Sequence, residues 1–160
     1  LFALASLYQT SKNENVLDLY CGCGAISLYI SGLVNSVYGV ELSAESITMA
    51  NVNAELNSVT NCEFKDMDVK DYLEKLIAEP ENKRFDTIIL DPPRSGIHPK
   101  AAEYLLEYAA KKIIYVSCNP GTQARDLALL KDKYEISKIQ PVDMFPHTFH
   151  IENVVRLDLK

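Results

Sequence analysis

The architecture of this chain is best inferred from residues 16–27, VLDLYCGCGAIS. The first half of this stretch is apolar and typical of a buried strand, and a helical pattern begins at its end. Between the two stand Gly22 and Gly24, which permit a tight turn and a close approach of the backbone to a ligand. A strand, a glycine turn and a helix in this order are typical of a doubly wound α/β fold.

This glycine turn differs from the dinucleotide-binding fingerprint G-x-G-x-x-G, because Ser27 stands in place of the third glycine. Seventeen residues after Gly24, the next apolar run ends in VYGVEL and places Glu41 at the end of a second strand. An acidic side chain there can accept hydrogen bonds from both hydroxyls of a ribose. Alone, Glu41 is equally well explained as a solvated strand end. Together with the glycine turn, it favours a site for a ligand that contains a ribose.

Apolar runs of strand length alternate with helical patterns along the whole chain. This alternation predicts an α/β fold with a seven-stranded, mostly parallel sheet and helices on both faces. Ser43 and Pro99 mark two helix starts, the first as a cap and the second as a first-turn proline. The predicted strands span residues 15–19, 36–40, 61–64, 87–90, 112–116, 134–141 and 150–158, and the predicted helices span residues 1–10, 25–30, 44–57, 69–77, 99–109 and 121–130.

The last predicted strand differs from the others in its direction. Only the segment VDMFPHTFH, residues 142–150, separates it from the strand before, which is too short for a helical crossover. The final strand is therefore expected to run antiparallel to its neighbour. An antiparallel strand begins at the edge where parallel strands end, so Glu152 should lie at the same edge as Cys118 and Asp91.

Length and composition indicate one domain of a larger protein. The chain has 160 residues, of which 48% are hydrophobic and 24% are charged, which suffices for one packed core. It begins at Leu1, directly inside an apolar pattern, so residues 1–160 are expected to be a fragment of a longer chain. No stretch approaches the roughly 18 apolar residues of a membrane span, and the first residues lack a signal-peptide pattern. These features predict a cytoplasmic protein without a membrane anchor.

The charge limits what this domain can bind by itself. The net charge of −6 has the wrong sign for a domain that grips a phosphate backbone. Any hold on nucleic acid is therefore expected to be local or to come from a missing N-terminal part.

The four cysteines are expected to be reduced thiols. Cys21, Cys23, Cys62 and Cys118 show neither a paired zinc spacing nor the disulfide framework of a secreted domain. Cys21 and Cys23 stand close together in the glycine turn, but no second pair of ligands follows in the sequence. We therefore predict no metal in this part of the protein.

Cys118 stands at the end of a strand, in IIYVSCNPGT, residues 113–122. Most free cysteines are small core residues, but a strand end followed by Asn119 and Pro120 is a poor position for one. Pro120 opens the next predicted helix, so the thiol should lie close to a helix N-terminus, whose partial positive charge favours the thiolate. Cys118 is therefore a candidate nucleophile.

Two carboxylates are candidates for work at the same edge. In TFHIENVV, alternation places His150, Glu152 and Val154 on one face of the last strand. A carboxylate on an otherwise apolar strand is unfavourable unless it is paired or used, although a surface-facing glutamate remains an alternative. Asp91 ends the fourth strand in ILDPPRSG, and the two prolines after it give a rigid exit that can hold a side chain against a ligand.

These motifs resemble those of known methyltransferases. DLYCGCG, VYGVE and DPPRSG together are similar to the motifs of Rossmann-like, class I methyltransferases that use S-adenosylmethionine. With SCNPGTQARD and FPHTFHIENVVRL added, the chain resembles the RNA uracil-5-methyltransferase family, which makes 5-methyluridine in rRNA or tRNA. The resemblance covers essentially the whole chain, and the last three motifs are the most specific. It implies a C-terminal catalytic domain with S-adenosylmethionine as cofactor and RNA as substrate, 23S rRNA being favoured.

The resemblance also implies which residues hold the cofactor. Tyr20, Gly22 and Gly24 correspond to residues around its methionine part, and Glu41 to the residue that binds its ribose. Asp91 is implied to lie between the cofactor and the target base.

The adenine end of the cofactor site is less well defined by the resemblance. Asp68 is the implied partner of the adenine amine, but KDMDVKD departs from the usual glycine-aspartate form, so Asp66 is a rival. The family also uses a glutamine upstream of this chain, which implies that the cofactor site here is incomplete.

The chemistry of uracil assigns roles to Cys118 and Glu152. Carbon 5 of uracil is too weakly nucleophilic to take a methyl group directly, but a thiolate that adds at carbon 6 turns carbon 5 into a nucleophile. A base must then remove the proton on carbon 5 so that the thiolate can leave. Cys118 is the predicted nucleophile and Glu152 the predicted base, with Arg94 and His150 as candidate RNA contacts. Arg94 could instead form an ion pair, and His150 could be an ordinary loop residue.

Other functions fit the sequence less well. Amino-group methylases of DNA place an aromatic residue after the prolines, where Arg94 stands, and RNA cytosine-5 methylases carry a further cysteine in that motif. A small-molecule methyltransferase has no need for both Cys118 and Glu152, and a nicotinamide dehydrogenase is disfavoured by Ser27 and by a cysteine without a role in hydride transfer. A cofactor-binding module that is inactive without its missing RNA-binding domain stays open.

Overall fold

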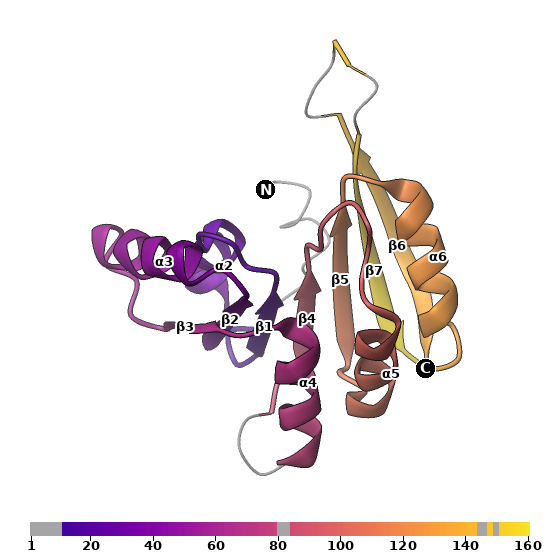
Figure 1. Ribbon diagram of the computed structural model, residues 1–160, viewed down its shortest axis with the longest axis horizontal. Helices are drawn as coiled ribbons and strands as arrows, with labels where there is room; N and C mark the ends of the chain where they lie inside the picture. Colours follow the sequence, from indigo (N-terminus) through magenta and orange to yellow (C-terminus); the bar gives the residue numbers. More distant parts are fainter. Residues whose placement is uncertain (1–10, 80–83, 144–146, 149–150) are drawn as a thin grey trace.

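The structure is a computed structural model that describes residues 11–79, 84–143, 147–148 and 151–160. The described residues contain one seven-stranded sheet, whose strand order is β3-β2-β1-β4-β5-β7-β6 (Figure 1). The strands are β1 (Asn15–Leu19), β2 (Ser36–Glu41), β3 (Cys62–Asp66), β4 (Thr87–Leu90), β5 (Lys112–Ser117), β6 (Tyr134–Val142) and β7 (Glu152–Leu159).

The strand directions agree with the prediction. Strands β1 to β5 pair in parallel, whereas β7 pairs antiparallel with both β5 and β6. The short connection between β6 and β7 accounts for the reversal, since a parallel return needs a dozen residues or more. The predicted α/β class, with helices on both faces and an antiparallel last strand, is confirmed.

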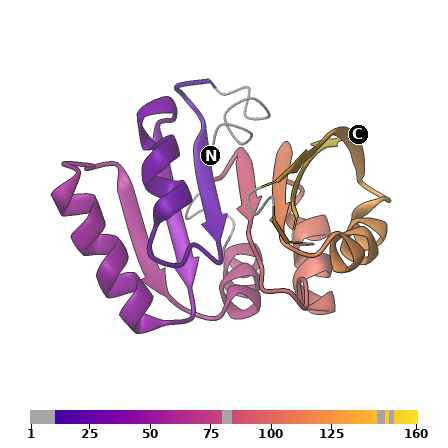
Figure 2. The same ribbon diagram turned by 90° about the horizontal axis from the view of Figure 1, so that it is seen from above.

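The helices pack on the sheet in two groups (Figure 2). Helices α4, α5 and α6 lie next to one another along one face, and α2 and α3 lie along the other. The helices are α2 (Ala25–Ile30), α3 (Ala44–Leu56), α4 (Val69–Ala78), α5 (Pro99–Tyr108) and α6 (Pro120–Leu130), with a short 3-10 helix, η1 (Ser31–Leu33), after α2. The helix predicted at residues 1–10 falls outside the described residues.

Local capping explains where several helices begin. The Ser43 hydroxyl accepts a hydrogen bond from the Ser46 backbone N–H at 3.2 Å, as predicted for a cap. Pro99 occupies the first turn of α5, as predicted, and His98 caps that helix by accepting from the Lys100 N–H through Nδ1 at 3.1 Å. His98 therefore has a structural role that the sequence did not indicate.

Several predicted boundaries differ from the structure by one or two residues, among them those of β3, α6 and β7. Strand β3 continues to Asp66, because backbone pairing with β2 extends through Lys65 and Asp66, where no apolar side chain signals a strand. Helix α6 begins at Pro120 rather than at residue 121, since a first-turn helical position needs no N–H donor. Strand β7 begins at Glu152, and residue 150, where it was predicted to begin, lies outside the described residues.

The hydrophobic core occupies both faces of the sheet. Alternate residues of a central strand point to opposite faces, so Ile88 and Leu90 pack toward α4 and α5 while Ile89 packs toward α2. Strands β4 and β5 are buried along their whole length, as expected for parallel strands that helices cover on both sides. This buried centre fixes the ends of β1 and β4, where the strand order reverses and where open α/β sheets bind ligands. Among the described residues, no helix is long and apolar enough to cross a membrane.

Candidate active site

The glycine turn after β1 adopts a backbone that few residues tolerate. Tyr20, Gly22 and Gly24 all have positive φ angles, of 64°, 52° and 83°. A tyrosine in this region is unusual, and such strained residues cluster at functional sites. Added to Gly22, a Cβ would meet nothing within 4 Å, so open space lies over the backbone there. Added to Gly24, it would press on the Phe64 ring at 3.0 Å, so that glycine is also needed for packing.

Glu41, the last residue of β2, hydrogen-bonds the backbone of this turn through its side chain. Its Oε2 accepts from the Gly22 N–H at 3.3 Å and its Oε1 accepts from the Ser43 N–H at 3.0 Å. A carboxylate has about four acceptor positions, so these two bonds orient Glu41 and leave it able to accept from hydroxyl groups. The predicted juxtaposition of Glu41 with the glycine turn is therefore observed.

Tyr20 lies among acidic side chains at this edge. Partial burial raises the pKa of its phenol to about 12, and the negative charges of Asp68, Asp126 and Glu41 add to the rise. The phenol therefore stays protonated and remains a hydrogen-bond donor.

Asp66 and Asp68 follow one another closely between β3 and α4, at the edge where Glu41 ends β2. Asp68 caps α4, with its Oδ1 accepting from the N–H groups of Lys70 at 2.9 Å and Asp71 at 3.3 Å. Asp66 ends β3 directly beside Glu41 in the parallel register. One carboxylate oxygen of Asp68 is used in capping the helix. Asp66 is more exposed than Asp68 and lies at the strand end, beside Lys65.

Asp18 is a further acidic residue at this edge that the motif analysis did not single out. It is fully buried in β1, and its Oδ2 accepts from the Ser27 hydroxyl at 2.5 Å. Among the described residues, Oδ1 has no hydrogen-bond partner. Desolvation raises its pKa to about 7, against the lowering effect of the Ser27 bond, and the charge of Asp91 adds to the rise. The available signal was a charged residue inside the apolar run VLDL.

Asp91 continues the row of carboxylates from β1 toward β7. Its backbone N–H donates to the Leu19 carbonyl at 3.3 Å, which joins the ends of β4 and β1. Although Asp91 is exposed at the rim, neighbouring protein atoms partly desolvate its carboxyl, and this desolvation with the charge of Glu152 raises its pKa to about 6. Asp91 and Glu152 are therefore close enough to interact, as expected from the antiparallel direction of β7.

Cys118 and Glu152 lie at adjoining ends of β5 and β7. The last residue pair of the β5–β7 ladder is Ser117 with Asn153, so Cys118 follows this pair by one residue in β5 and Glu152 precedes it by one residue in β7. Glu152 itself pairs with Val142 of β6. Both residues are half-buried, so each is reachable from solvent. Cys118 and Glu152 therefore lie near the same end of two paired strands, and their catalytic roles stay predictions.

The turn after Cys118 is held by its own side chains. Asn119 caps α6, and its Oδ1 accepts from the N–H groups of Gly121 at 3.1 Å and Thr122 at 3.4 Å. The Ser117 hydroxyl accepts from the Asn119 N–H at 3.1 Å. These bonds place Cys118 two residues before the helix, as the sequence predicted.

Side chains at the start of α6 and within it hydrogen-bond the loop that follows Asp91. The Arg94 carbonyl accepts from Asn119 Nδ2 at 3.2 Å and from the Thr122 hydroxyl at 3.1 Å. Arg125 donates to the Ser95 carbonyl at 2.8 Å. These hydrogen bonds join the loop after β4 to the turn that carries Cys118.

Asp126 completes this contact from inside the protein. It is fully buried, and its Oδ2 accepts from the Ile97 N–H at 2.9 Å and from the Tyr115 hydroxyl at 2.6 Å, while Arg125 binds its Oδ1. Gly96 has a φ of 82°, and a Cβ there would overlap Asp126. The predicted supporting role of Arg125 and Asp126 is confirmed.

Of the two predicted RNA contacts, Arg94 and His150, the structure describes Arg94. The Arg94 side chain is exposed and forms no ion pair with any described residue, so it is available to a substrate. His150 lies outside the described residues. In the described ranges, no group of three or more His, Cys, Asp or Glu residues could hold a metal ion.

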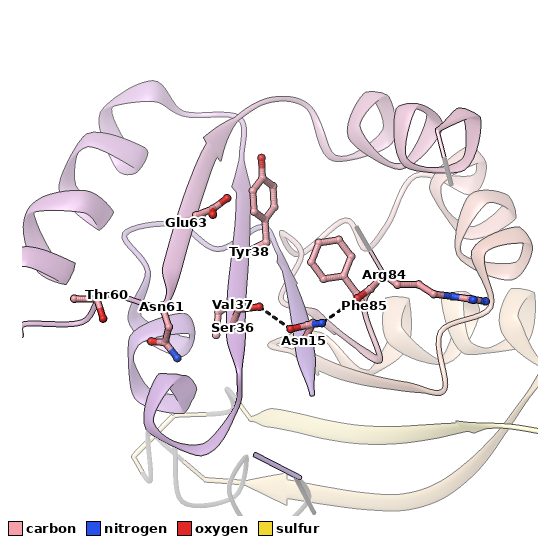
Figure 3. Close-up of a pocket in the computed structure, with 9 residues that line it drawn as sticks. All are labelled: Asn15, Ser36, Val37, Tyr38, Thr60, Asn61, Glu63, Arg84 and Phe85. Carbon is pink, nitrogen blue, oxygen red and sulfur yellow. Dashed lines mark hydrogen bonds between the residues drawn. The ribbon is translucent and has the colours of Figure 1, made fainter. Parts of the chain in front are cut away.

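A cavity of about 260 Å³ lies at the opposite end of the sheet (Figure 3). Asn15 joins its walls, since its Oδ1 accepts from the Ser36 hydroxyl at 2.8 Å and its Nδ2 donates to the Arg84 carbonyl at 3.4 Å. The parallel strands begin at this edge, whereas ligand sites of open α/β sheets lie beyond the strands' carboxyl ends. The cavity is therefore separate from the candidate active site.

The strand order, the glycine turn and the acidic residues at the carboxyl edge define a Rossmann-like methyltransferase. The crystal structure of a precorrin-6y C5,15-methyltransferase from Geobacter metallireducens has the same fold, with a TM-score of 0.78 over 98% of this chain and 86% of that one. Its sequence is only 11% identical, so the likeness concerns the fold alone.

Sequence comparison narrows this class. The chain belongs to the tRNA (uracil-5-)-methyltransferase family, whose model matches residues 2–160. An uncharacterized RNA methyltransferase of Bacteroides thetaiotaomicron is 48% identical over 147 residues, which make up 92% of this chain and 32% of that protein. The family resemblance inferred from the motifs is confirmed.

The solved structure of a uracil-5-methyltransferase is also similar to this chain. The tRNA (uracil-54, C5)-methyltransferase of Pyrococcus abyssi, in complex with S-adenosyl-L-homocysteine, is 37% identical with a TM-score of 0.81. The match covers 98% of this chain and 36% of that one. The chain therefore spans about a third of the length of these relatives.

Proposed function

We propose that this chain is the catalytic domain of an enzyme that methylates carbon 5 of a uridine in RNA, with S-adenosylmethionine as the methyl donor. The observation that carries the proposal is the β5–β7 ladder, which ends at Ser117 and Asn153, one residue from Cys118 and from Glu152, with the Asp91 carboxyl near enough to Glu152 to feel its charge. Membership of the uracil-5-methyltransferase family supports it. So does the S-adenosyl-L-homocysteine bound to the Pyrococcus abyssi relative.

The glycine turn suits this cofactor. Open space over Gly22 admits a ligand against the backbone, and Glu41 keeps acceptor positions for the two ribose hydroxyls. We assign Tyr20 and Gly24 of the same turn to the methionine part, and Asp68 or Asp66 to the adenine amine. When bound, S-adenosylmethionine supplies an electrophilic methyl group on a sulfonium.

Cys118 and Glu152 then divide the chemistry. The Cys118 thiolate adds to carbon 6 of the uracil, and the electron pair of the broken 5,6 double bond makes carbon 5 nucleophilic. After carbon 5 has gained the methyl group, Glu152 removes the proton from that carbon. The freed electron pair re-forms the 5,6 double bond, the carbon–sulfur bond breaks, and the thiolate is regenerated. Asp91, between the cofactor turn and Glu152, lies where the base and the methyl group meet.

The RNA substrate is part of the same proposal. The motifs favoured 23S rRNA, whereas the Pyrococcus abyssi relative acts on uridine 54 of tRNA, which gives tRNA at least equal support. Exposed Arg94 is placed to contact the RNA at the active-site rim. With a net charge of −6, this domain relies on the rest of the protein for its hold on RNA. We place the reaction in the cytoplasm, where RNA substrate is available and unpaired cysteines stay reduced.

A mechanism-based trap tests this function. The full-length protein is mixed with S-adenosylmethionine and RNA that contains 5-fluorouridine, and the products are examined by mass spectrometry. Fluorine on carbon 5 cannot be removed as a proton, so a covalent RNA adduct that carries the transferred methyl group is expected on Cys118. Cys118→Ala should abolish the adduct and turnover while leaving cofactor binding intact, whereas Cys23→Ala, at an exposed cysteine of the glycine turn, should still form the adduct. Failure of the wild-type protein to form an adduct with any RNA would contradict the proposal.

A further inference from the structure

Gln123 is a buried polar residue in the first half of α6, only 1% exposed. Its Nε2 donates to the Tyr115 carbonyl at 2.9 Å and to the Asn153 carbonyl at 3.2 Å. Its Oε1 accepts from Asn153 Nδ2 at 2.7 Å. Both amide donors and the acceptor are thus used, which offsets the unfavourable burial of an amide.

These three bonds join the two strands that carry the proposed nucleophile and base. Tyr115 lies in β5, the strand that leads to Cys118, and Asn153 directly follows Glu152 in β7. Asn153 is also the β7 member of the last ladder pair. Helix α6 packs beside this end of the sheet (Figure 1) and begins directly after the Cys118 turn.

Other polar side chains at the start of α6 hydrogen-bond a different part of this edge. Asn119, Thr122, Arg125 and Asp126 bind the loop after β4 or the inside of that loop. The Gln123 amide hydrogen-bonds β7 at Asn153, while Glu152 pairs with Val142 of β6. The Gln123 amide therefore holds the residue next to Glu152 against β5 and α6.

Resting on the proposed function, we propose that Gln123, paired with Asn153, is a positioning residue that sets the Glu152 carboxylate for removal of the carbon 5 proton. Proton abstraction requires a base within hydrogen-bond reach of the proton, and a displacement of about 1 Å can slow such a step on the order of a hundredfold. Gln123 acts on the position of Glu152 and does not touch the substrate. Its loss should slow the final elimination more than the formation of the adduct.

The test compares these two steps in the full-length protein. Gln123→Met keeps the length and volume of the side chain but removes all three hydrogen bonds. We expect cofactor affinity within about threefold of wild type, a near-normal rate of adduct formation with 5-fluorouridine RNA, and release of methylated product from ordinary RNA slower by at least about tenfold. A covalent, methylated uridine adduct should accumulate on ordinary RNA, and raising the pH should not restore release.

Two further variants sharpen the comparison. Asn153→Ala removes one bond of the bridge but leaves the backbone acceptor for Gln123, so it should slow release less than Gln123→Met does. It also carries the test if Gln123→Met does not fold. The control is Gln140→Met, in β6, whose amide donates to the neighbouring Pro141 carbonyl; this change should leave every step unchanged.

The outcomes separate this inference from the function on which it rests. If the wild-type protein forms no fluorouridine adduct, the proposed function fails. If wild type forms the adduct but the bridge variants slow adduct formation and release equally, or slow neither, then Gln123 has only a structural role and the inference is overturned. Selective slowing of release supports it.

Discussion

At the residue scale, the candidate site depends on side chains whose surroundings change their chemistry. Asp91 and Asp18 both have a raised pKa, because each is desolvated and each lies near a second carboxylate. The charge of Glu152 acts on Asp91, and Glu152 directly precedes Asn153, the β7 member of the last pair with β5. Neighbouring carboxylates whose surroundings move their pKa values apart are typical of sites that transfer protons.

Replacing Glu152 should separate methyl transfer from product release. Glu152→Gln keeps the size of the side chain but removes the base, so the carbon 5 proton stays and the thiolate cannot leave. We expect turnover to fall on the order of a hundredfold or more, with a methylated RNA adduct on Cys118 visible by mass spectrometry. Glu135→Gln, at an exposed position of β6, should have no effect. Product release at the normal rate from the Glu152 variant would assign the base elsewhere.

Asp18 should make the stability of the protein depend on pH. Its pKa rises from 3.8 in the unfolded chain to about 7 in the folded one, so the folded state binds more protons between these values. The free energy of unfolding should therefore fall as the pH rises from about 5 to about 8, by roughly 2–3 kcal/mol.

The check is urea unfolding of the wild-type protein and Asp18→Asn at both ends of this range. The variant should lose most of the pH dependence, since its amide does not ionise. Asp66→Asn, whose side chain is 55% exposed, serves as the control and should keep the wild-type dependence. An unchanged slope in Asp18→Asn would mean that another group causes it.

At the scale of elements, the contact between α6 and the loop after β4 assembles the site. Asn119, Thr122 and Arg125 bind successive carbonyls of that loop, and Asp126 binds the Ile97 N–H. Because Cys118 precedes α6 directly, the same helix positions the thiol and the loop that begins with Asp91. The loop thus gains a fixed conformation from hydrogen bonds to side chains, without being part of the sheet.

At Gly96, the loop after β4 packs so closely against α6 that no side chain fits between them. A Cβ there would overlap Asp126, and the φ of 82° is unfavourable for any other residue. Gly96→Ala should lower the free energy of unfolding by about 1–3 kcal/mol and slow adduct formation with 5-fluorouridine RNA. Gly32→Ala, where a Cβ meets nothing within 4 Å, is the matched control. Wild-type stability and adduct formation in Gly96→Ala would show that the loop is not held by this contact.

At the scale of the whole molecule, we expect the chain to carry out the chemistry and to bind RNA only weakly by itself. It spans about a third of the length of its relatives and has a net charge of −6. The described part nevertheless contains a complete sheet with a core on both faces. Cofactor binding and hold on RNA are therefore expected to belong to different parts of the protein.

This division can be measured with the isolated domain. We expect residues 1–160 to bind S-adenosylmethionine with an affinity within about tenfold of the full-length protein, but to form the 5-fluorouridine adduct at least about tenfold more slowly, because phosphate contacts supply most of the affinity for RNA. Added salt should slow adduct formation by the full-length protein more than by the isolated domain, so the difference between the two rates should become smaller. Equal rates at every salt concentration would place the RNA-binding surface within this domain.

Much of the fold followed from local patterns. The strand ranges 15–19 and 87–90 and the helix range 25–30 were predicted without error, because apolar period and turn residues act over a few neighbours. Loop length alone predicted that β7 runs antiparallel. The errors fell at ends such as Asp66, where backbone pairing with a distant strand extends an element that its own side chains do not mark.

Residue types and their order in the chain thus sufficed for the class of fold, the family and the choice of Cys118 and Glu152 as candidates. The placement of those two residues, the buried carboxylate of Asp18 and the bridge from Gln123 to Asn153 became visible only in three dimensions. Gln123 and Asn153 are 30 positions apart, and neither carries a local signal. Their roles come from the hydrogen bonds and burial created when β5, β7 and α6 pack together, and such contacts depend on the whole sheet.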